Sequence, residues 1–194
     1  VTALKEGNAT ITLKVEIDGR VSSLVASKRV IVKNEFVIEG QTLVAYKGLG
    51  GDVVIPDDKG ILYIGPFAFS LYTNDYTIEL PEGDYDAGKT PASNNTVTSV
   101  TIPYDVLEVQ KYAFYNCTAL ETVNFLSNDK NESCKFIREY AFSKATSLKN
   151  INLENVGMIG NNAFEDCTSL NNVDLRGAYA IGRRAFYNCT SLEY

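Results

Sequence analysis

The chain has 194 residues, 45% of them apolar, which is enough material for a buried core and for one or two domains. Histidine is absent, which excludes catalysis by Ser-His or Cys-His pairs and removes the most common metal ligand. The formal net charge of −6 argues against nucleic acid as a partner, because such binding needs a clustered basic surface.

The first 33 residues differ from the rest of the chain in charge and pattern. Residues 1–33 carry six Lys or Arg against three Asp or Glu, whereas residues 34–194 carry twelve against twenty-one. Apolar and polar residues alternate over 9–17, a turn is predicted at Asp18 and Gly19, and Arg29–Val32 predicts another strand. The stretch Val1–Thr12 resembles the C-terminal half of bacterial Ig-like group 2 domains. We therefore expect a β segment at 1–33 that is part of an Ig-like domain.

A repeat dominates residues 34–194. The dipeptide Ala-Phe occurs five times, and its last two intervals are both 22 residues long. An Ile or Val stands four residues before each Ala, and a Leu stands six residues after each of the last four Phe residues. The dipeptides begin at Ala68, Ala113, Ala141, Ala163 and Ala185. The Ile or Val residues four positions earlier are Ile64, Val109, Ile137, Ile159 and Ile181. The leucines are Leu120, Leu148, Leu170 and Leu192.

The first three of these leucines each begin an L-x-x-[VI]-x-[LF] stretch, whose alternating second half is typical of a strand with one buried face. One such unit cannot bury its own apolar residues, but stacked copies form a continuous core. Each period therefore predicts a strand, a turn and a short helical segment that carries Ala-Phe. We expect strands of successive coils to pair in parallel, about 4.8 Å apart.

The consensus I-G-x-x-A-F-x-x-C-T-S-L-x-x-[VI]-x-L resembles the BspA-like leucine-rich-repeat family over about residues 36–194, most clearly at Ile159–Leu175. The resemblance implies a right-handed α/β solenoid over 34–194, with a parallel sheet on one face and short helical turns on the other. It also implies a bacterial protein that is secreted or at the cell surface, often with a role in adhesion. Insertions near 71–96 and 127–135 depart from the pattern, and we expect the natural protein to continue beyond the last coil.

Three of the four cysteines, Cys117, Cys167 and Cys189, share one repeat position, three residues after the Phe. We interpret them as small buried residues rather than as a thiol ladder that oxidises or binds metal, because Ala145 fills the same position. Cys134 lies in an insertion and is predicted to be the one exposed thiol. The chain has no C-x-x-C pair to begin a zinc site, so no metal or cofactor is expected.

The outward positions of the predicted strands form two polar columns on the exposed side of the sheet. Neutral amides and hydroxyls at fixed spacing can hydrogen-bond a glycan or a peptide backbone. The alternative interpretation is that a solvated sheet face needs polar residues and has no ligand. The possible ligand face consists of Ser99, Thr101, Thr122, Asn124, Asn150, Asn152, Asn172 and Asp174.

The sequence thus favours a non-catalytic monomer, extracellular or at the cell surface, whose repeat array binds an unidentified protein or glycan. The alternative is a structural spacer that presents neighbouring domains. An enzyme is not expected, because catalysis without His would rest on a carboxylate pair, and the repeat places none in a recognisable cleft. No apolar run approaches the roughly 18 residues of a transmembrane helix, so no membrane-spanning segment is expected in this chain.

Overall fold

The computed structural model describes residues 7–13, 16–17, 20–21, 26–32, 35–70, 93–128 and 134–193. The chain forms two compact units, Val1–Glu35 and Phe36–Tyr194. Most of the two expected insertions lies outside the described residues, at 71–92 and 129–133.

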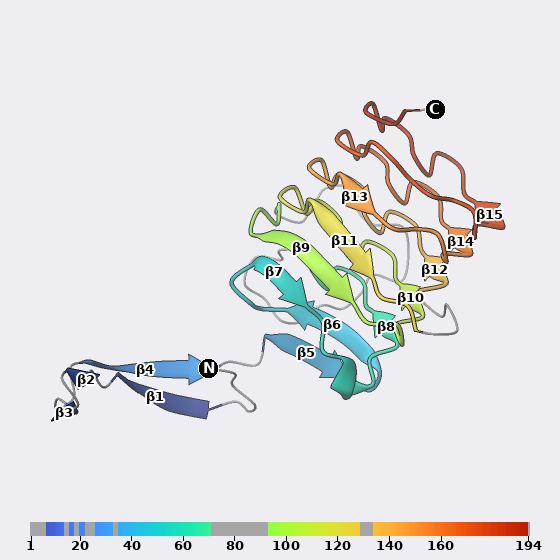
Figure 1. Ribbon diagram of the computed structural model, residues 1–194. Helices are drawn as coiled ribbons and strands as arrows, with labels where there is room; N and C mark the ends of the chain where they lie inside the picture. The colour runs from blue at the N-terminus through green and yellow to red at the C-terminus, as the bar shows by residue number, and fades with distance from the viewer. Residues whose placement is uncertain are drawn as a thin grey trace. The chain divides into compact units, whose positions relative to one another are not determined.

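The N-terminal unit contains two antiparallel hairpins (Figure 1). β1 (Gly7–Leu13) pairs with β4 (Ala26–Val32) without a register shift, from Gly7 opposite Val32 to Leu13 opposite Ala26. The short strands β2 (Glu16–Ile17) and β3 (Arg20–Val21) lie between them along the chain and pair with each other. The predicted β segment is therefore present, and its resemblance to an Ig-like domain stays a prediction.

The second unit is a solenoid with two sheets (Figure 1). The strand order is β15-β14-β12-β10-β8-β6-β5 in the seven-stranded sheet and β13-β11-β9-β7 in the four-stranded sheet. Described strand pairs in this unit are parallel except for the β5–β6 hairpin. The seven-stranded sheet comprises β5 (Phe36–Glu39), β6 (Thr42–Tyr46), β8 (Tyr63–Ile64), β10 (Glu108–Val109), β12 (Phe136–Ile137), β14 (Met158–Ile159) and β15 (Ala180–Ile181). The four-stranded sheet comprises β7 (Gly51–Val54), β9 (Val97–Ile102), β11 (Thr122–Phe125) and β13 (Asn150–Ile151), and a 3₁₀ helix at Asp57–Lys59 follows β7.

The parallel-stranded solenoid predicted from the repeat is confirmed, but the described Ala-Phe segments are hydrogen-bonded turns rather than helical segments. The N–H of Ala113 donates to the carbonyl of Gln110 at 3.2 Å, and the N–H of Tyr115 donates to the carbonyl of Tyr112 at 3.0 Å. Two residues in such a coil have a left-handed backbone, here Tyr112 with φ 62° and Asn116 with φ 58°. A right-handed helix cannot continue through these residues. The coil therefore bends at turns and forms two sheets, where the sequence predicted one parallel sheet with short helical turns on the other face.

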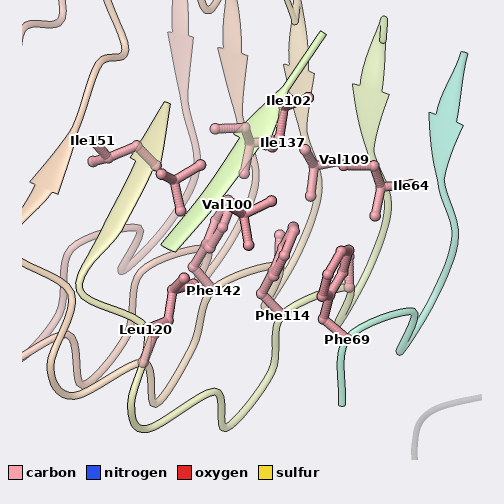
Figure 2. Packing of buried hydrophobic residues seen from close by; sticks show 14 of the residues in the cluster. Ile64, Phe69, Val100, Ile102, Val109, Phe114, Leu120, Ile137, Phe142 and Ile151 are labelled. Atoms are coloured by element: carbon pink, nitrogen blue, oxygen red, sulfur yellow. The ribbon is translucent and has the colours of Figure 1, made fainter. Parts of the chain in front are cut away.

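Phenylalanine rings form the centre of the core (Figure 2). Successive ring centroids are 4.5 Å apart from Phe69 to Phe114, 4.9 Å to Phe142, 5.2 Å to Phe164 and 5.1 Å to Phe186. In the first four of these coils, the N–H of the Phe donates to the carbonyl of the Ala in the next coil at 2.7–2.9 Å. The alanines beside the rings are at most 3% exposed. Their small side chains therefore let the coils approach closely.

The stack of rings extends into the β5–β6 hairpin, which has no Ala-Phe dipeptide. Tyr46 of β6 lies 5.2 Å from Phe69 between ring centroids, and Phe36 of β5 lies 5.4 Å from Tyr46. The N–H of Tyr46 donates to the carbonyl of Ala68 at 2.7 Å, which is the bond that Phe makes in the later coils. Ala45 and Tyr46 thus take the place of Ala-Phe in the first coil, and a search for the dipeptide alone does not find them.

Asn94 returns the chain to the repeat after residues 71–92. It is 3% exposed and occupies the cysteine position, three residues before Val97. Its side-chain Nδ2 donates to the carbonyl of Phe69 at 2.6 Å, and its Oδ1 accepts from the N–H of Val97 at 3.2 Å. In the next coil the backbone N–H of Cys117 donates to the carbonyl of Phe114. The side chain of Asn94 therefore supplies a bond that the backbone makes where the coil is uninterrupted.

Candidate functional site

The predicted ligand face lies on the outward side of the four-stranded sheet. Ser99, Thr122 and Asn150 are Cα partners in adjacent strands, and Thr101 and Asn124 are partners in a second column. Parallel strands lie about 4.8 Å apart, so these side chains are neighbours across the sheet. The other three residues, Asn152, Asn172 and Asp174, lie outside the assigned strands at corresponding repeat positions.

Exposure follows the alternation expected of a sheet with one buried face. The inward residues Val100, Val123 and Ile151 are at most 6% exposed. The outward residues are either exposed, namely Asn124, Asn150, Asn152 and Asn172, or half-buried, namely Ser99, Thr101, Thr122 and Asp174.

Two of the eight residues serve the turns that follow the strand positions. The Oδ1 of Asn152 accepts a hydrogen bond from the N–H of Glu154 at 3.0 Å, and the Oδ1 of Asp174 accepts from the N–H of Arg176 at 3.1 Å. A side chain that accepts from the backbone two residues on forms an Asx turn. Asn152 and Asp174 therefore have a structural role that the strand pattern did not reveal.

Asp52 belongs to the same face, although the sequence reasoning did not select it. It is the Cα partner of Ser99, and its Oδ1 accepts a hydrogen bond from the Ser99 Oγ at 2.7 Å. The available sequence signal was its place directly before Val53 and Val54, two β-branched residues typical of a strand. The hydroxyl of Ser99 thus already has a hydrogen-bond partner within the molecule.

The amides of Asn124, Asn150 and Asn172 make no side-chain hydrogen bond with the part of the chain that the structure describes. Beside them lies an ion pair between the Nζ of Lys149 and the Oε2 of Glu121, at 2.9 Å and about half exposed on both sides. An exposed pair of this kind contributes little to stability. These three amides are therefore the groups of the face most available to an external partner.

The C-terminal border of the face is charged. The Arg176 guanidinium bonds Asp174 at 2.7 Å and Glu154 at 3.1 Å. The hydrogen bond from the Arg176 side chain holds the pKa of the Asp174 carboxyl below its usual value. These three charged side chains therefore lie at the edge of the predicted ligand face rather than at its centre.

The three cysteines that share a repeat position are core residues with a common bond. The thiols of Cys117, Cys167 and Cys189 donate to the carbonyl of the Phe in the preceding coil, at 3.5, 3.2 and 3.1 Å. Burial raises the pKa of all three thiols, that of Cys189 to about 11. All four cysteines are free, so they are unreactive packing residues at neutral pH rather than a disulfide framework.

The prediction that Cys134 is exposed is wrong. Cys134 is 1% exposed, and burial raises the pKa of its thiol to about 12. It stands three residues before Ile137, a position filled by Ile61, Val106 and Val156 in other coils. Cys134 is therefore a regular repeat residue that follows the insertion rather than part of it.

We expect the protein to lose stability as the pH rises above about 9, because its thiols are buried in the neutral form. Their pKa is raised by folding, so the stabilisation is complete below the unfolded pKa and is lost as the pH rises toward the folded pKa. Urea midpoints measured in reductant at about pH 8 and about pH 10 check this, with a slope of up to about 1.4 kcal/mol per pH unit for each thiol.

The matched control is Cys167→Ala, because Ala145 shows that alanine fits this position. The control should lose less stability over the same pH interval, since tyrosine and lysine titration is common to both proteins. Equal losses of stability in the two proteins would show that the buried thiols do not cause the pH dependence.

In the described residues, no group of three or more His, Cys, Asp or Glu side chains is placed to hold a metal ion. Nor does that part of the chain contain a helix that is long and apolar enough to cross a membrane.

Known proteins share this repeat and this fold. The family described as BspA type Leucine rich repeat region matches residues 51–131 and 88–194, in six copies. A leucine rich repeat protein from T. pallidum is 24% identical with a TM-score of 0.58, and the match covers 78% of this chain and 60% of that protein. One from Bacteroides ovatus ATCC 8483 is 24% identical with a TM-score of 0.55, and covers 100% of this chain and 40% of that protein. The chain thus spans less than two thirds of either protein. No curated protein sequence matches it.

Proposed function

Because the chain belongs to the BspA-type leucine-rich repeat family, we propose that it is a non-catalytic bacterial protein, secreted or at the cell surface, whose repeat array binds a protein or glycan partner. We place the binding surface on the outward side of the four-stranded sheet and expect the protein to act as a monomer. The sheet is a rigid element, and binding groups on rigid elements need little ordering when a partner docks.

The observation that carries the proposal is the set of free amides at Asn124, Asn150 and Asn172. Each amide offers two N–H donors and a carbonyl acceptor, which match the hydroxyls of a glycan or the backbone of a peptide. Packing does not require an amide at these positions, because Thr122 and Thr101 are Cα partners of Asn150 and Asn124 on the same face.

The test is a screen of glycan and protein arrays with the purified chain, followed by affinity measurement on any partner found. Asn124→Ala, Asn150→Ala and Asn172→Ala are then combined in one variant. We expect its affinity to fall at least about tenfold, since each hydrogen bond contributes about 0.5–1.5 kcal/mol. Asn152 is left unchanged because its Asx turn has a structural role. Gln41→Ala, which removes an exposed amide from the β5–β6 turn, is the matched control and should bind normally.

A partner that binds the triple variant as tightly as the unchanged chain would show that another surface is responsible. Absence of binding to any array would favour the alternative function, a spacer that presents neighbouring domains.

A further inference from the structure

The seven-stranded sheet has an outward face with chemistry unlike that of the four-stranded sheet. Glu108, Phe136, Met158 and Ala180 are consecutive Cα partners in β10, β12, β14 and β15, which lie side by side in Figure 1. These residues face away from the core, because the residue that follows in β10, β12 and β14 is at most 1% exposed. Aromatic, thioether and charged groups thus replace the amides and hydroxyls of the other face.

On this face the ring of Tyr179 lies over Gly157 of the preceding coil. A Cβ built on Gly157 would be 2.5 Å from the ring Cε1 and 3.2 Å from Cδ1, so the ring fills space that a larger residue would occupy. The N–H of Tyr179 donates to the carbonyl of Gly157 at 2.9 Å, which holds the two residues together. Tyr179 is nevertheless 71% exposed. The ring therefore rests on backbone and leaves much of its surface open to solvent.

Arg138 follows β12, in the coil before Gly157, and its side chain lies on the same face of the seven-stranded sheet. Its Nη2 bonds the Oε2 of Glu108 at 2.7 Å, and its guanidinium carbon lies 5.1 Å from the centroid of the Phe136 ring. Its Nη1 is 4.0 Å from the Sδ of Met158. Tyr179 is among the groups that act electrostatically on the Arg138 guanidinium, so the two side chains lie near each other on this face. The result is an open aromatic ring with a paired guanidinium and carboxylate nearby.

We propose that this point is a subsite for a neutral sugar, with the sugar ring stacked on Tyr179 and its hydroxyls hydrogen-bonded to Glu108 and Arg138. The C–H side of a hexose is apolar and slightly positive, and it complements the negative face of an aromatic ring. A hydroxyl both donates and accepts, so it can bond a carboxylate oxygen and a guanidinium N–H. The subsite lies on a different sheet from the free amides, so neither proposal depends on the other.

The charges of the subsite favour an uncharged ligand. Glu108 and Arg138 neutralise each other across a 2.7 Å ion pair. An anionic ligand would be repelled by the Glu108 carboxylate, and a cationic ligand would be repelled by the Arg138 guanidinium. A neutral polyol adds hydrogen bonds to both groups and leaves the pair intact.

The test is titration of the chain with cellotetraose, maltotetraose and laminaritetraose, measured by calorimetry and by saturation-transfer NMR. We expect at least one of these sugars to bind, with saturation transferred from tyrosine protons. Tyr179→Ala should weaken this binding about tenfold, because it removes the stacking surface, whereas Tyr179→Phe should retain it. Tyr187→Ala, which removes another exposed ring from the same coil, is the matched control and should bind normally.

Gly157→Ala is an independent variant that leaves the Tyr179 side chain in place. The new Cβ would lie 2.5 Å from the present position of the ring, so the ring must move and binding should weaken. A sugar that binds Tyr179→Ala weakly and the Asn124, Asn150 and Asn172 triple variant at full strength is bound at this subsite, whereas the reverse pattern would place it on the face of the four-stranded sheet and overturn the proposal. Failure of all three sugars to bind the unchanged chain would overturn the proposal, as would equal binding by Tyr179→Ala. Binding of a neutral proline-rich peptide without binding of any sugar would also overturn it.

Discussion

Replacing Phe142 with alanine is expected to lower the free energy of unfolding by about 3–5 kcal/mol. The Phe142 side chain is 0% exposed, and its ring stacks between those of Phe114 and Phe164, at 4.9 and 5.2 Å. The neighbouring rings cannot close the resulting cavity, because hydrogen bonds between coils hold the backbone beside each of them. Urea unfolding followed by circular dichroism measures the change.

Phe186→Ala is the matched control for Phe142→Ala. Phe186 has the same repeat position, but its ring stacks only on Phe164 among the described residues, and it is half-buried. Its loss should therefore destabilise the protein by less, since a smaller cavity forms and solvent can fill it. Equal losses for the two variants would contradict a core centred on the stack of rings.

Gly160→Ala is expected to lower the free energy of unfolding by about 1–3 kcal/mol through crowding between coils. A Cβ on Gly160 would lie 2.6 Å from the N of Glu139 and 2.7 Å from the C of Arg138. Both atoms belong to the backbone of the preceding coil, so they can move only if the coils separate. The same urea titration measures the effect, and a weakened solenoid should also show a lower Tm.

A glycine with open surroundings provides the comparison for Gly160. Gly40 has a φ of 59°, and no atom lies within 4 Å of the place that a Cβ would take. Gly40→Asn therefore meets no steric obstacle and introduces a residue that tolerates left-handed backbone. Its effect should be clearly smaller than that of Gly160→Ala. A greater loss for Gly40→Asn would mean that backbone conformation, rather than the contact between coils, dominates at these glycines.

The packing positions of the repeat could be predicted because burial requires a similar residue in every coil. Ile137, Ala141 and Phe142 are each 0% exposed, and each belongs to a column with little variation. The burial of Cys134 was not predicted, because its repeat position holds several residue types and because it follows an insertion. Its signal was present, since Val106 and Val156 stand at the same distance before a strand.

The bends of the coil could be predicted only in part, because positive φ occurs both at residues that favour it, such as Asn116 and Asn188, and at residues that do not. Tyr112, Lys144 and Arg184 adopt positive φ, although Gly and Asn are the residues that favour it. For this reason the sequence predicted helical turns where the chain forms hydrogen-bonded turns and a second sheet. On the predicted ligand face, the alternation of apolar and polar residues indicated which side chains point outward. It could not indicate that Asn152 bonds the N–H of Glu154, because this bond depends on the turn after the strand.

The position of Asn94 has a consequence for how such an array can change over evolutionary time. Its buried side chain donates to the carbonyl of Phe69, in place of the bond that the backbone N–H of Cys117 donates to Phe114 in the next coil, so a side chain closes the coil at this point. We therefore expect insertion or deletion of residues between 70 and 93 to leave the register of the later coils unchanged, at an entropy cost that grows only slowly with the length of the added segment. The same junction offers protein engineers a site for grafting foreign peptides, with Asn94 kept as the fixed closing residue.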